Sequence, residues 1–296
     1  MKRFLAWLLA LLFTVSALAA CSKGAEENTD GGATGGTSEE GSAGGGVTND
    51  GADTEHKGPE PPKEAELFYE LNDDGTGYIV VHNATPDAIV ASIPATYKGK
   101  PVVAIGDSAF RDSATLQTVT LPDSITEFGA CAFFGCQSLL SFSLPASLTV
   151  IGDFAFYDCY NLASFTASDT LVSIGTQAFY GTAYYNNAAN WENDVLYFGS
   201  YLLCARPYFS GMCTVREGTA FIANAAFSGC EGLASVAIPK SVTRIGMGAF
   251  FGCGALTAIR YAGTASAWET VEKGMYFDMD AGDYTVICSD GELSKE

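Results

Sequence analysis

The sequence predicts a β-rich α/β solenoid, in which short strands stack in a parallel ladder and are joined by short helical or 3-10 turns. Three observations predict this fold. One motif recurs with a period of 23 residues, and part of each motif alternates apolar and polar residues as a strand does. The segments before, within and after the repeats have the patterns of hairpins and end caps.

Residues 1–20 are predicted to be a secretory signal peptide. Lys2 and Arg3 precede an apolar stretch of about 14 residues, which is shorter than the roughly 20 that a transmembrane helix needs. The stretch ends in Leu18-Ala19-Ala20-Cys21, which resembles the bacterial lipobox. The resemblance implies cleavage before Cys21, lipidation of its thiol and attachment to a membrane through acyl chains. The alternative is an ordinary cleavage site with an incidental cysteine.

Residues 21–66 are predicted to be the lipidated N-terminus followed by a disordered linker. The linker is rich in glycine and acidic residues and has no aromatic residue. Such a segment cannot bury enough apolar surface to offset the entropy of ordering it. We expect it to hold the folded part of the chain away from the membrane.

Residues 67–101 are predicted to form an N-terminal β cap. The runs 68–71 and 78–81 flank an Asp74-Gly75 turn and indicate a hairpin that covers the first repeat.

The repeats occupy residues 102–261. Each contains a small residue preceded by an apolar one, then Ala-Phe three and four residues later, then Ser, Cys or Thr three residues after the Phe. The small residues are Gly106, Gly129, Gly152, Gly175, Ala223 and Gly246. A Leu-x-x-Φ-x-Φ-Pro segment follows in several copies, where Φ is apolar, and it indicates a short strand that ends at the proline. One repeat cannot bury its apolar face alone, so stacked copies must share a core.

The spacing between Gly175 and Ala223 is 48 residues, which places an insertion at about 184–208. The runs 195–198 and 201–204 flank Gly199-Ser200 and indicate a hairpin. Insertions in solenoids sit on the surface and often bind ligands, so Trp191, Tyr197 and Tyr201 are candidate contacts. The alternative is a routine variant packed on the convex side. Residues 262–296 are predicted to be a C-terminal cap and tail, with Trp268 covering the last turn and a final strand at 284–288.

The repeat pattern resembles the BspA-type leucine-rich repeat of bacterial surface proteins, over roughly residues 67–275. The resemblance implies a secreted or surface-attached protein, and some members of that family are adhesins. It implies a class of role and no particular ligand.

Composition and motifs argue against several functions. The formal net charge is −19, which disfavours binding to nucleic acid. There are only 2 His, and no catalytic, phosphate-binding or metal motif occurs, so we expect no enzyme activity, cofactor or metal.

The cysteines at the repeat position are interpreted as core thiols, and a disulfide between Cys204 and Cys213 is left open. The acidic run 278–283 is either a solvated loop or a calcium site. An envelope or glycan-degrading enzyme built on the insertion remains an alternative.

The candidate binding face is the row of outward-facing strand positions, which is mostly small hydroxyl residues. Its members are Thr118, Thr120, Ser141, Ser143, Ser164, Thr166, Thr214, Ser235 and Arg260. We expect this face to bind a protein or glycan on the extracytoplasmic side of a bacterial membrane, in a lipid-anchored monomer. Two alternatives remain: a solvated face that needs only solubility, and a structural spacer without a ligand.

Overall fold

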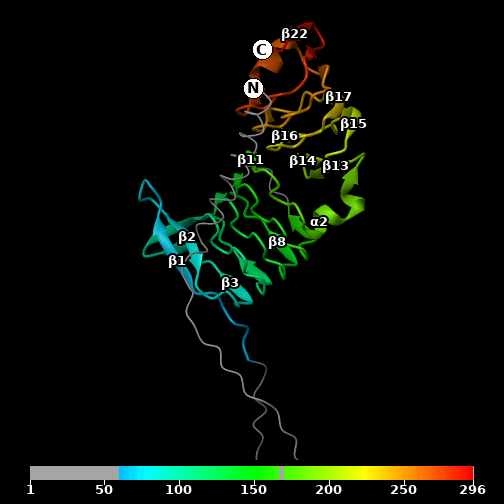
Figure 1. Ribbon diagram of the computed structural model, residues 1–296. Helices are drawn as coiled ribbons and strands as arrows, with labels where there is room; N and C mark the ends of the chain where they lie inside the picture. The colour runs from blue at the N-terminus through cyan, green and yellow to red at the C-terminus, as the bar shows by residue number, and fades with distance from the viewer. Residues whose placement is uncertain (1–59, 167–169, 296) are drawn as a thin grey trace, which may run out of the picture.

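The computed structural model describes residues 60–166 and 170–295 and shows a solenoid whose turns stack along one axis (Figure 1). Cys21 and most of the predicted linker lie outside the described residues, so the signal peptide, the lipidation and the disorder of the linker remain predictions. None of the helices in the described part of the chain is long and apolar enough to span a membrane.

One side of the solenoid contains the strands that end just before the small residues of the repeats, such as Gly106 and Gly129, and we call it the glycine-side sheet. Its first part has the order β1-β2-β5-β7-β9-β11, with β4 (Thr96–Tyr97) paired to β5. The bounds are β1 Leu67–Leu71, β2 Tyr78–Asn83, β5 Lys100–Ile105, β7 Glu127–Phe128, β9 Val150–Ile151 and β11 Ser173–Ile174. Its second part has the order β12-β13-β14-β16-β18-β20. These strands are β12 Trp191–Glu192, β13 Val195–Phe198, β14 Tyr201–Ala205, β16 Phe221–Ile222, β18 Arg244–Ile245 and β20 Glu272–Lys273.

The opposite side is built from the Leu-x-x-Φ-x-Φ segments, and we call it the leucine-side sheet. It consists of the pair β3-β6, the pair β8-β10 and the five-stranded sheet β15-β17-β19-β21-β22. The bounds are β3 Val90–Ser92, β6 Thr118–Thr120, β8 Ser141–Ser143, β10 Ser164–Thr166, β15 Ser210–Thr214, β17 Gly232–Ile238, β19 Ala258–Tyr261, β21 Thr285–Ile287 and β22 Glu292–Ser294. Neighbouring repeat strands pair in parallel, as the sequence predicts.

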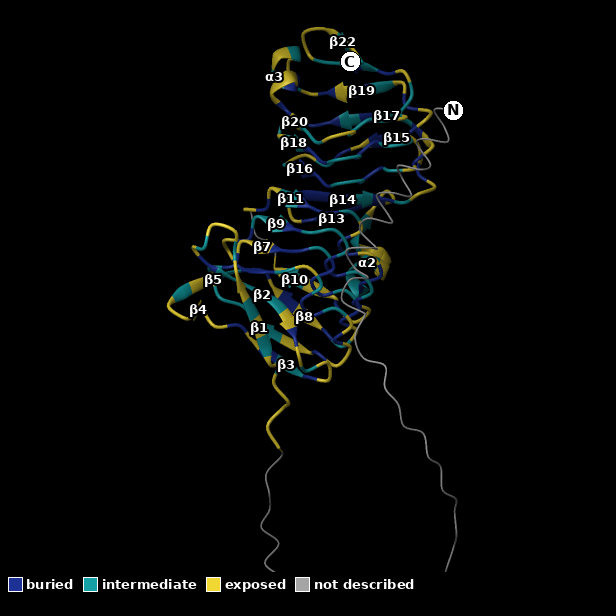
Figure 2. Cartoon of the chain, turned by 60° about the vertical axis from the view of Figure 1, so that its left-hand side comes forward, coloured by how far each residue is buried: buried dark blue, intermediate teal, exposed yellow. Residues whose placement is uncertain are grey.

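The core lies between the two sheets. Figure 2 shows buried positions in each layer of the stack. The repeat phenylalanines stack ring on ring, with centroids 5.2 Å apart for Phe110 and Phe133 and 5.3 Å apart for Phe133 and Phe156. Each of these rings is almost completely buried. The expectation that the repeat Phe fills the space between strand and opposite wall is therefore confirmed.

The segment from the repeat glycine to the leucine folds as consecutive turns of the 3-10 type, which is one of the two forms that the sequence predicts, and not as a continuous helix. Ala109 N bonds to Gly106 O, and Arg111 N bonds to Ser108 O, so each bond spans three residues. Ser108 and Asp112 both have φ of 57°, and a left-handed residue interrupts a right-handed helix. In the described residues, helices occur only outside these segments, at α2 (Ala183–Asn186), η1 (Ala188–Asn190) and α3 (Ala265–Thr270).

The two ends of the folded chain agree with the sequence prediction to different degrees. The predicted strand at 284–288 forms as β21, but it is not the last strand, because β22 follows it. Strands β1 and β2 pair antiparallel, which confirms the N-terminal hairpin. Trp268 lies on α3 and is buried 5.3 Å from the ring of Tyr261. The parallel ladders continue beyond residue 261, however, because β20 pairs with β18 and β21 pairs with β19. The C-terminal segment therefore adds one more layer to the solenoid.

The hairpin β13–β14 forms as predicted, but its predicted place on the surface is wrong. Every residue of β13 is buried, and β14 pairs in parallel with β16. Side chains alternate between the two faces of a strand. Leu196 and Phe198 therefore pack in the hydrophobic core of the first stack, whereas Val195 and Tyr197 pack in that of the second. The hairpin is a wall between two separate cores.

Candidate functional site

The predicted binding face lies on the leucine-side sheet, and most of its members are exposed. Val119, Phe142 and Phe165 point inward between the hydroxyl residues of β6, β8 and β10, and Phe142 is buried. On the outer side, eight of the nine predicted positions are exposed, and the ninth, Ser235, is half-buried. The exposed ones are Thr118, Thr120, Ser141, Ser143, Ser164, Thr166, Thr214 and Arg260.

The strand register brings equivalent residues side by side. Ser141 pairs with Ser164 and Ser143 with Thr166, so β8 and β10 present two columns of hydroxyls. Strand β6 lies next to β8. The exposed hydroxyls of β6, β8 and β10 can both donate and accept hydrogen bonds.

The row is interrupted, which corrects the expectation of one continuous face. Strand β10 pairs only with β8 within the described residues, and β15 pairs only with β17. The inserted segment 183–205 lies between these strands in the chain, and its hairpin continues the glycine-side sheet alone. The predicted residues therefore fall into two blocks, one on β6, β8 and β10 and one on β15, β17 and β19.

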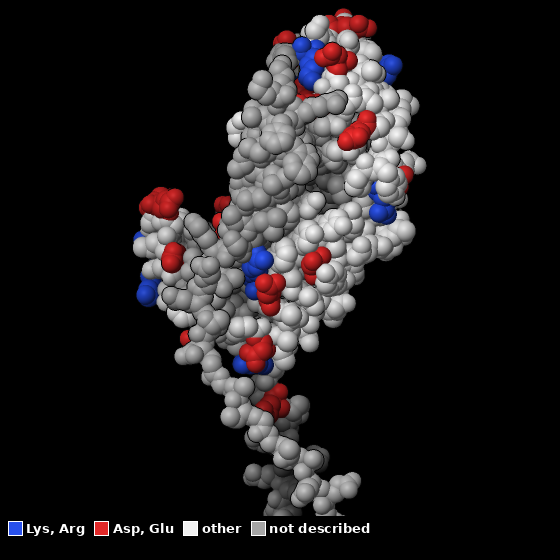
Figure 3. Space-filling view, in the orientation of Figure 1, with Lys and Arg blue, Asp and Glu red and all other residues white. Residues whose placement is uncertain are grey.

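The second block ends in a shallow depression. Thr214, Ala237 and Arg260 pair across β15, β17 and β19 and line it together with Glu217. Its volume is about 220 Å³. That is below the 300–1,000 Å³ typical of small-molecule pockets, so it can accept a side chain more readily than a whole cofactor. The rest of the strand face is almost uncharged, and Figure 3 shows a broad part of the described surface with few charged side chains.

The predicted contacts on the insertion do not share one surface. Tyr197 is 4% exposed and Tyr201 is 1% exposed, so neither ring is available to a ligand in this structure, because both faces of the hairpin are covered by cores. The hydroxyl of Tyr197 accepts a hydrogen bond from Arg216 N at 3.0 Å. Trp191 is half-buried, with the Arg206 guanidinium 3.9 Å above its ring.

The repeat cysteines have a role beyond filling space. The thiols of Cys136, Cys159 and Cys253 each donate to the backbone carbonyl of the Phe one turn earlier, at 3.1 Å. The Cys230 thiol, in the turn that follows the hairpin, donates to Arg206 O at 3.4 Å. Burial raises the pKa of the Cys253 thiol to about 12, which keeps it neutral and unreactive. Cys204 and Cys213 are both free thiols, so the disulfide left open by the sequence is not formed.

The acidic run near the C-terminus is engaged within the protein. The Tyr284 hydroxyl donates to Asp278 Oδ2 at 2.7 Å, and the Lys295 ammonium lies 4.0 Å from the same oxygen. In residues 60–166 and 170–295, no group of three or more His, Cys, Asp or Glu is placed to hold a metal ion.

A second aromatic stack lies outside the core, and the sequence reasoning missed it. Phe134, Tyr157 and Tyr180 follow the repeat Phe in consecutive turns, and their rings stack with centroids 5.1 Å apart. The guanidinium of Arg111 covers one end of the stack, 4.6 Å from the Phe134 centroid. The signal was the residue after each repeat Phe, which is aromatic in three successive repeats.

The comparisons agree with this architecture. The family model described as "BspA type Leucine rich repeat region" matches residues 96–206 and 212–276 in 6 copies. The chain belongs to this family. No curated protein sequence matches the chain.

Solved structures of leucine-rich repeat proteins are similar to the chain. One is the Treponema pallidum leucine-rich repeat protein, at 23% identity over 71% of this chain and 79% of that one, with a TM-score of 0.37. A leucine-rich cell surface protein of Faecalibacterium prausnitzii has 18% identity over 70% and 97%, with a TM-score of 0.27. A leucine-rich repeat protein of Bacteroides ovatus has 19% identity over 75% and 70%, with a TM-score of 0.30.

Proposed function

We propose that this leucine-rich repeat protein is a non-catalytic recognition module that binds a protein or glycan outside the cell. The observation that carries the proposal is the exposed hydroxyl surface on β6, β8 and β10. Its six predicted positions are exposed and carry no acidic or basic side chain. Such a surface supplies hydrogen bonds to an extended partner, but it has no group suited to transfer a proton or attack a bond.

The structural support is the aromatic packing beneath this surface. Phe142 lies under the hydroxyls of β8 and contacts the rings of Phe133 and Phe156, 5.0 Å and 5.1 Å away. A buried aromatic network holds the strand backbone, so the hydroxyls are positioned before a ligand arrives. Preorganisation reduces the entropy lost on binding.

The test is binding by the full chain with Thr118, Ser141 and Ser164 changed to Lys, measured by pull-down from extracellular material and on a glycan array. The lysines add bulk and charge to the centre of the face and should abolish binding. The matched control carries lysine at Gln137, Ser147 and Ala189, which are exposed positions outside the predicted row. Equal binding by both variants would refute the strand-face site. If the unchanged chain bound nothing, the proposal of a recognition module would be wrong, and the protein would be a structural spacer.

We also propose that the protein is held at the extracytoplasmic face of a bacterial membrane by lipid on Cys21. The support is the lipobox-like sequence that precedes this residue. Globomycin should block processing of the precursor, and Cys21→Ala should release the protein from the membrane fraction. Unchanged membrane partition of the Cys21→Ala variant would contradict the proposal.

A further inference from the structure

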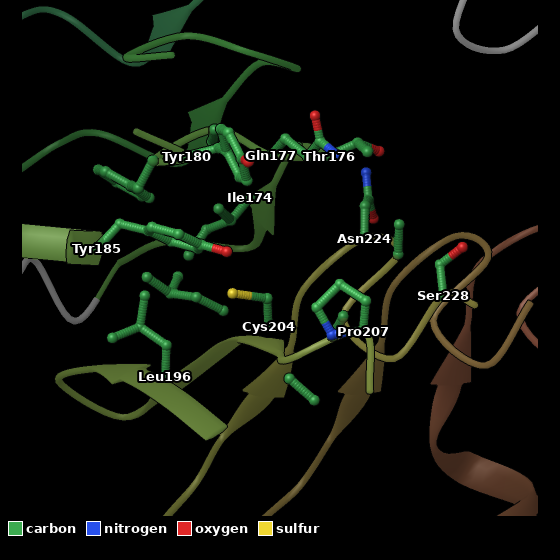
Figure 4. Close-up of a pocket in the computed structure, with 17 residues that line it drawn as sticks. Ile174, Thr176, Gln177, Tyr180, Tyr185, Leu196, Cys204, Pro207, Asn224 and Ser228 are labelled. Carbon is green, nitrogen blue, oxygen red and sulfur yellow. The ribbon is translucent and has the colours of Figure 1, made fainter. Parts of the chain in front are cut away.

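A pocket of about 240 Å³ lies where the first stack of turns meets the second (Figure 4). One wall is the turn after β11, which contains Gln177 and Tyr180. The opposite wall is the turn after β16, which contains Asn224 and Ser228. Tyr185 of α2 extends its ring across the pocket, and Cys204 of β14 lies beneath it.

The pocket exists because the hydrogen-bond ladder between turns is interrupted there. In the preceding step of the stack, Phe154 N bonds to Thr176 O, and Phe156 N bonds to Ala178 O. The same pattern resumes above the junction, where Ala225 N bonds to Met247 O. At the junction, the equivalent donors are the N–H groups of Gln177 and Phe179. They find no acceptor among the described residues, although both residues line the pocket.

The opposite wall has unused acceptors. The backbone oxygens of Asn224 and Ser228 accept no hydrogen bond from the described residues, although they stand where Thr176 O and Tyr180 O accept one in the turn below. The Tyr185 hydroxyl also has no partner there. Burial raises the pKa of Tyr185 to about 12, so this hydroxyl stays protonated and can donate. Phe179 is buried, whereas Gln177 is exposed and Asn224 and Ser228 are half-buried, so the pocket is open to solvent. The unused backbone groups are therefore free to bond with water or with the polar groups of a ligand.

The chemistry of the lining restricts that ligand. None of the described residues that line the pocket is charged, which disfavours a phosphate, a carboxylate or an ammonium ion. The rings of Tyr180 and Tyr185 and the face of Pro207 supply an apolar side, and the polar groups gather on the two turn walls. A ligand that fits must be neutral, with one apolar face and an edge of groups that both donate and accept.

The size of the pocket restricts the ligand to a single ring. The volume is below the 300 Å³ at which pockets for drug-sized molecules begin. Leu196 and Leu203 of the hairpin line the pocket and add to its apolar surface. A peptide strand would need to enter and leave, whereas the terminal residue of a glycan needs only one opening.

We propose that this junction pocket binds one neutral sugar residue at the end of a glycan. The proposal rests on the proposed function in treating the chain as a recognition module, but it uses a site separate from the strand face. The ring of the sugar lies against Tyr185, and its hydroxyls bond to the unpaired groups of the two turns.

The test uses the indole signal of Trp191 in the ¹⁵N-labelled full chain. The Trp191 Nε1 group donates to the backbone oxygen of Tyr185 at 2.7 Å, so it reports on the pocket, and the buried Trp268 is a distant reference. The probes are the methyl glycosides of glucose, galactose, mannose and N-acetylglucosamine. At least one should shift the Trp191 signal saturably, in about the millimolar range expected of a single small ring.

Two variants separate binding from folding. Ser228→Tyr fills the pocket and should abolish the shift; it is compatible with the fold because Tyr157 and Tyr180 occupy the equivalent position in other turns. Tyr185→Phe keeps the ring but removes the hydroxyl and should weaken binding about threefold to tenfold. Tyr160→Phe, an exposed phenol outside the pocket, is the matched control and should bind normally.

The outcomes distinguish this site from the strand face. Sugar binding that survives the lysine variant of Thr118, Ser141 and Ser164 but is lost in Ser228→Tyr supports the pocket, whether or not the strand face binds anything. No saturable shift with any of the four glycosides overturns the proposal, and so does an unchanged shift in Ser228→Tyr. A shift produced only by N-acetyl-tyrosinamide overturns it in favour of a protein side chain.

Discussion

Individual glycines set how closely the turns can stack. A Cβ built on Gly152 would lie 2.5 Å from the backbone carbon of Gly129 in the turn below. Gly175 and Gly246 face the same obstacle, at 2.3 Å and 2.5 Å from backbone nitrogens. Ala223 stands at the glycine position in the repeat that follows the hairpin. The neighbouring chain there is β14 of the hairpin, and the N–H of Ala223 donates to Leu202 O.

Gly152→Ala should therefore destabilise the protein by about 3 kcal/mol, because the clash is with backbone that cannot rotate away. Urea denaturation measures the free energy of unfolding. Gly254→Ala is the control, because nothing lies within 4 Å of its Cβ position, and it should be neutral or slightly stabilising. Similar losses in the two variants would contradict the close-stacking explanation.

The buried thiols make stability depend on alkaline pH. Burial raises the pKa of Cys204, Cys213 and Cys253 to about 12 and that of Cys230 to about 11. In the unfolded chain these thiols lose their protons near their ordinary pKa of about 8.5, before the folded ones do. The unfolded state then binds fewer protons, so folding stability is complete below that pH and falls as pH rises toward 12.

We expect the free energy of unfolding to fall between about pH 9 and 12, by up to about 1.4 kcal/mol per pH unit for each thiol. Cys253→Ser should flatten this slope, because serine does not titrate and its hydroxyl can keep the bond to Phe227 O. Ser113 holds the equivalent position in the first repeat. An unchanged slope in Cys253→Ser would count against a buried thiol as the cause.

At the scale of elements, the sequence predicts which segments form strands better than where they lie. The hairpin 195–204 follows from two apolar runs around Gly199-Ser200, and it forms. Its depth was misjudged, although four consecutive apolar residues at 195–198 indicate a strand covered on both faces. The two-residue strands of the glycine-side sheet were not predicted, because a segment of that length has no measurable alternation.

The candidate site was predictable to a similar extent. Alternation along β6, β8 and β10 places Thr118, Ser141 and Ser164 on the outer side correctly. The break between the two blocks and the junction pocket were not predictable, because both depend on how the inserted segment packs between turns. No local pattern around Gln177 or Phe179 shows that their N–H groups lack partners.

Two variants test whether the hairpin is structural. Leu196 and Leu202 are both fully buried, in the first and the second core respectively. Changing either to Ala should cost about 2–5 kcal/mol in thermal or urea unfolding. Leu140→Ala, at a position that is 59% exposed, should change stability by less than about 0.5 kcal/mol. Small losses at both buried positions would show that the hairpin is a dispensable addition.

At the scale of the whole molecule, the hairpin divides one solenoid into two stacks with separate hydrophobic cores. Direct bonds between the stacks include Asn224 N to Ile174 O at 3.1 Å and Arg244 Nη1 to Val172 O at 3.0 Å. In repeat proteins, stability is approximately the sum of each repeat and its contacts with neighbours. The junction has fewer hydrogen bonds between neighbouring turns than the other interfaces, so it should contribute least to stability. We therefore expect the two stacks to unfold separately from each other at the junction.

Unfolding should therefore proceed in two steps when one part is weakened. Phe250→Ala removes a fully buried ring from the second core and should cost that part about 3–5 kcal/mol. Two single-tryptophan chains follow the two parts separately by fluorescence. In both chains Trp7 is changed to Phe; one keeps only Trp268, in the second core, and the other keeps only Trp191, which packs against the first core. In Phe250→Ala, the Trp268 transition should move to lower urea while the Trp191 transition stays near its original midpoint. In Phe133→Ala, the Trp191 transition should instead move to lower urea while the Trp268 transition stays near its original midpoint. Transitions that coincide in both variants would show that the two cores unfold as one unit despite the wall between them.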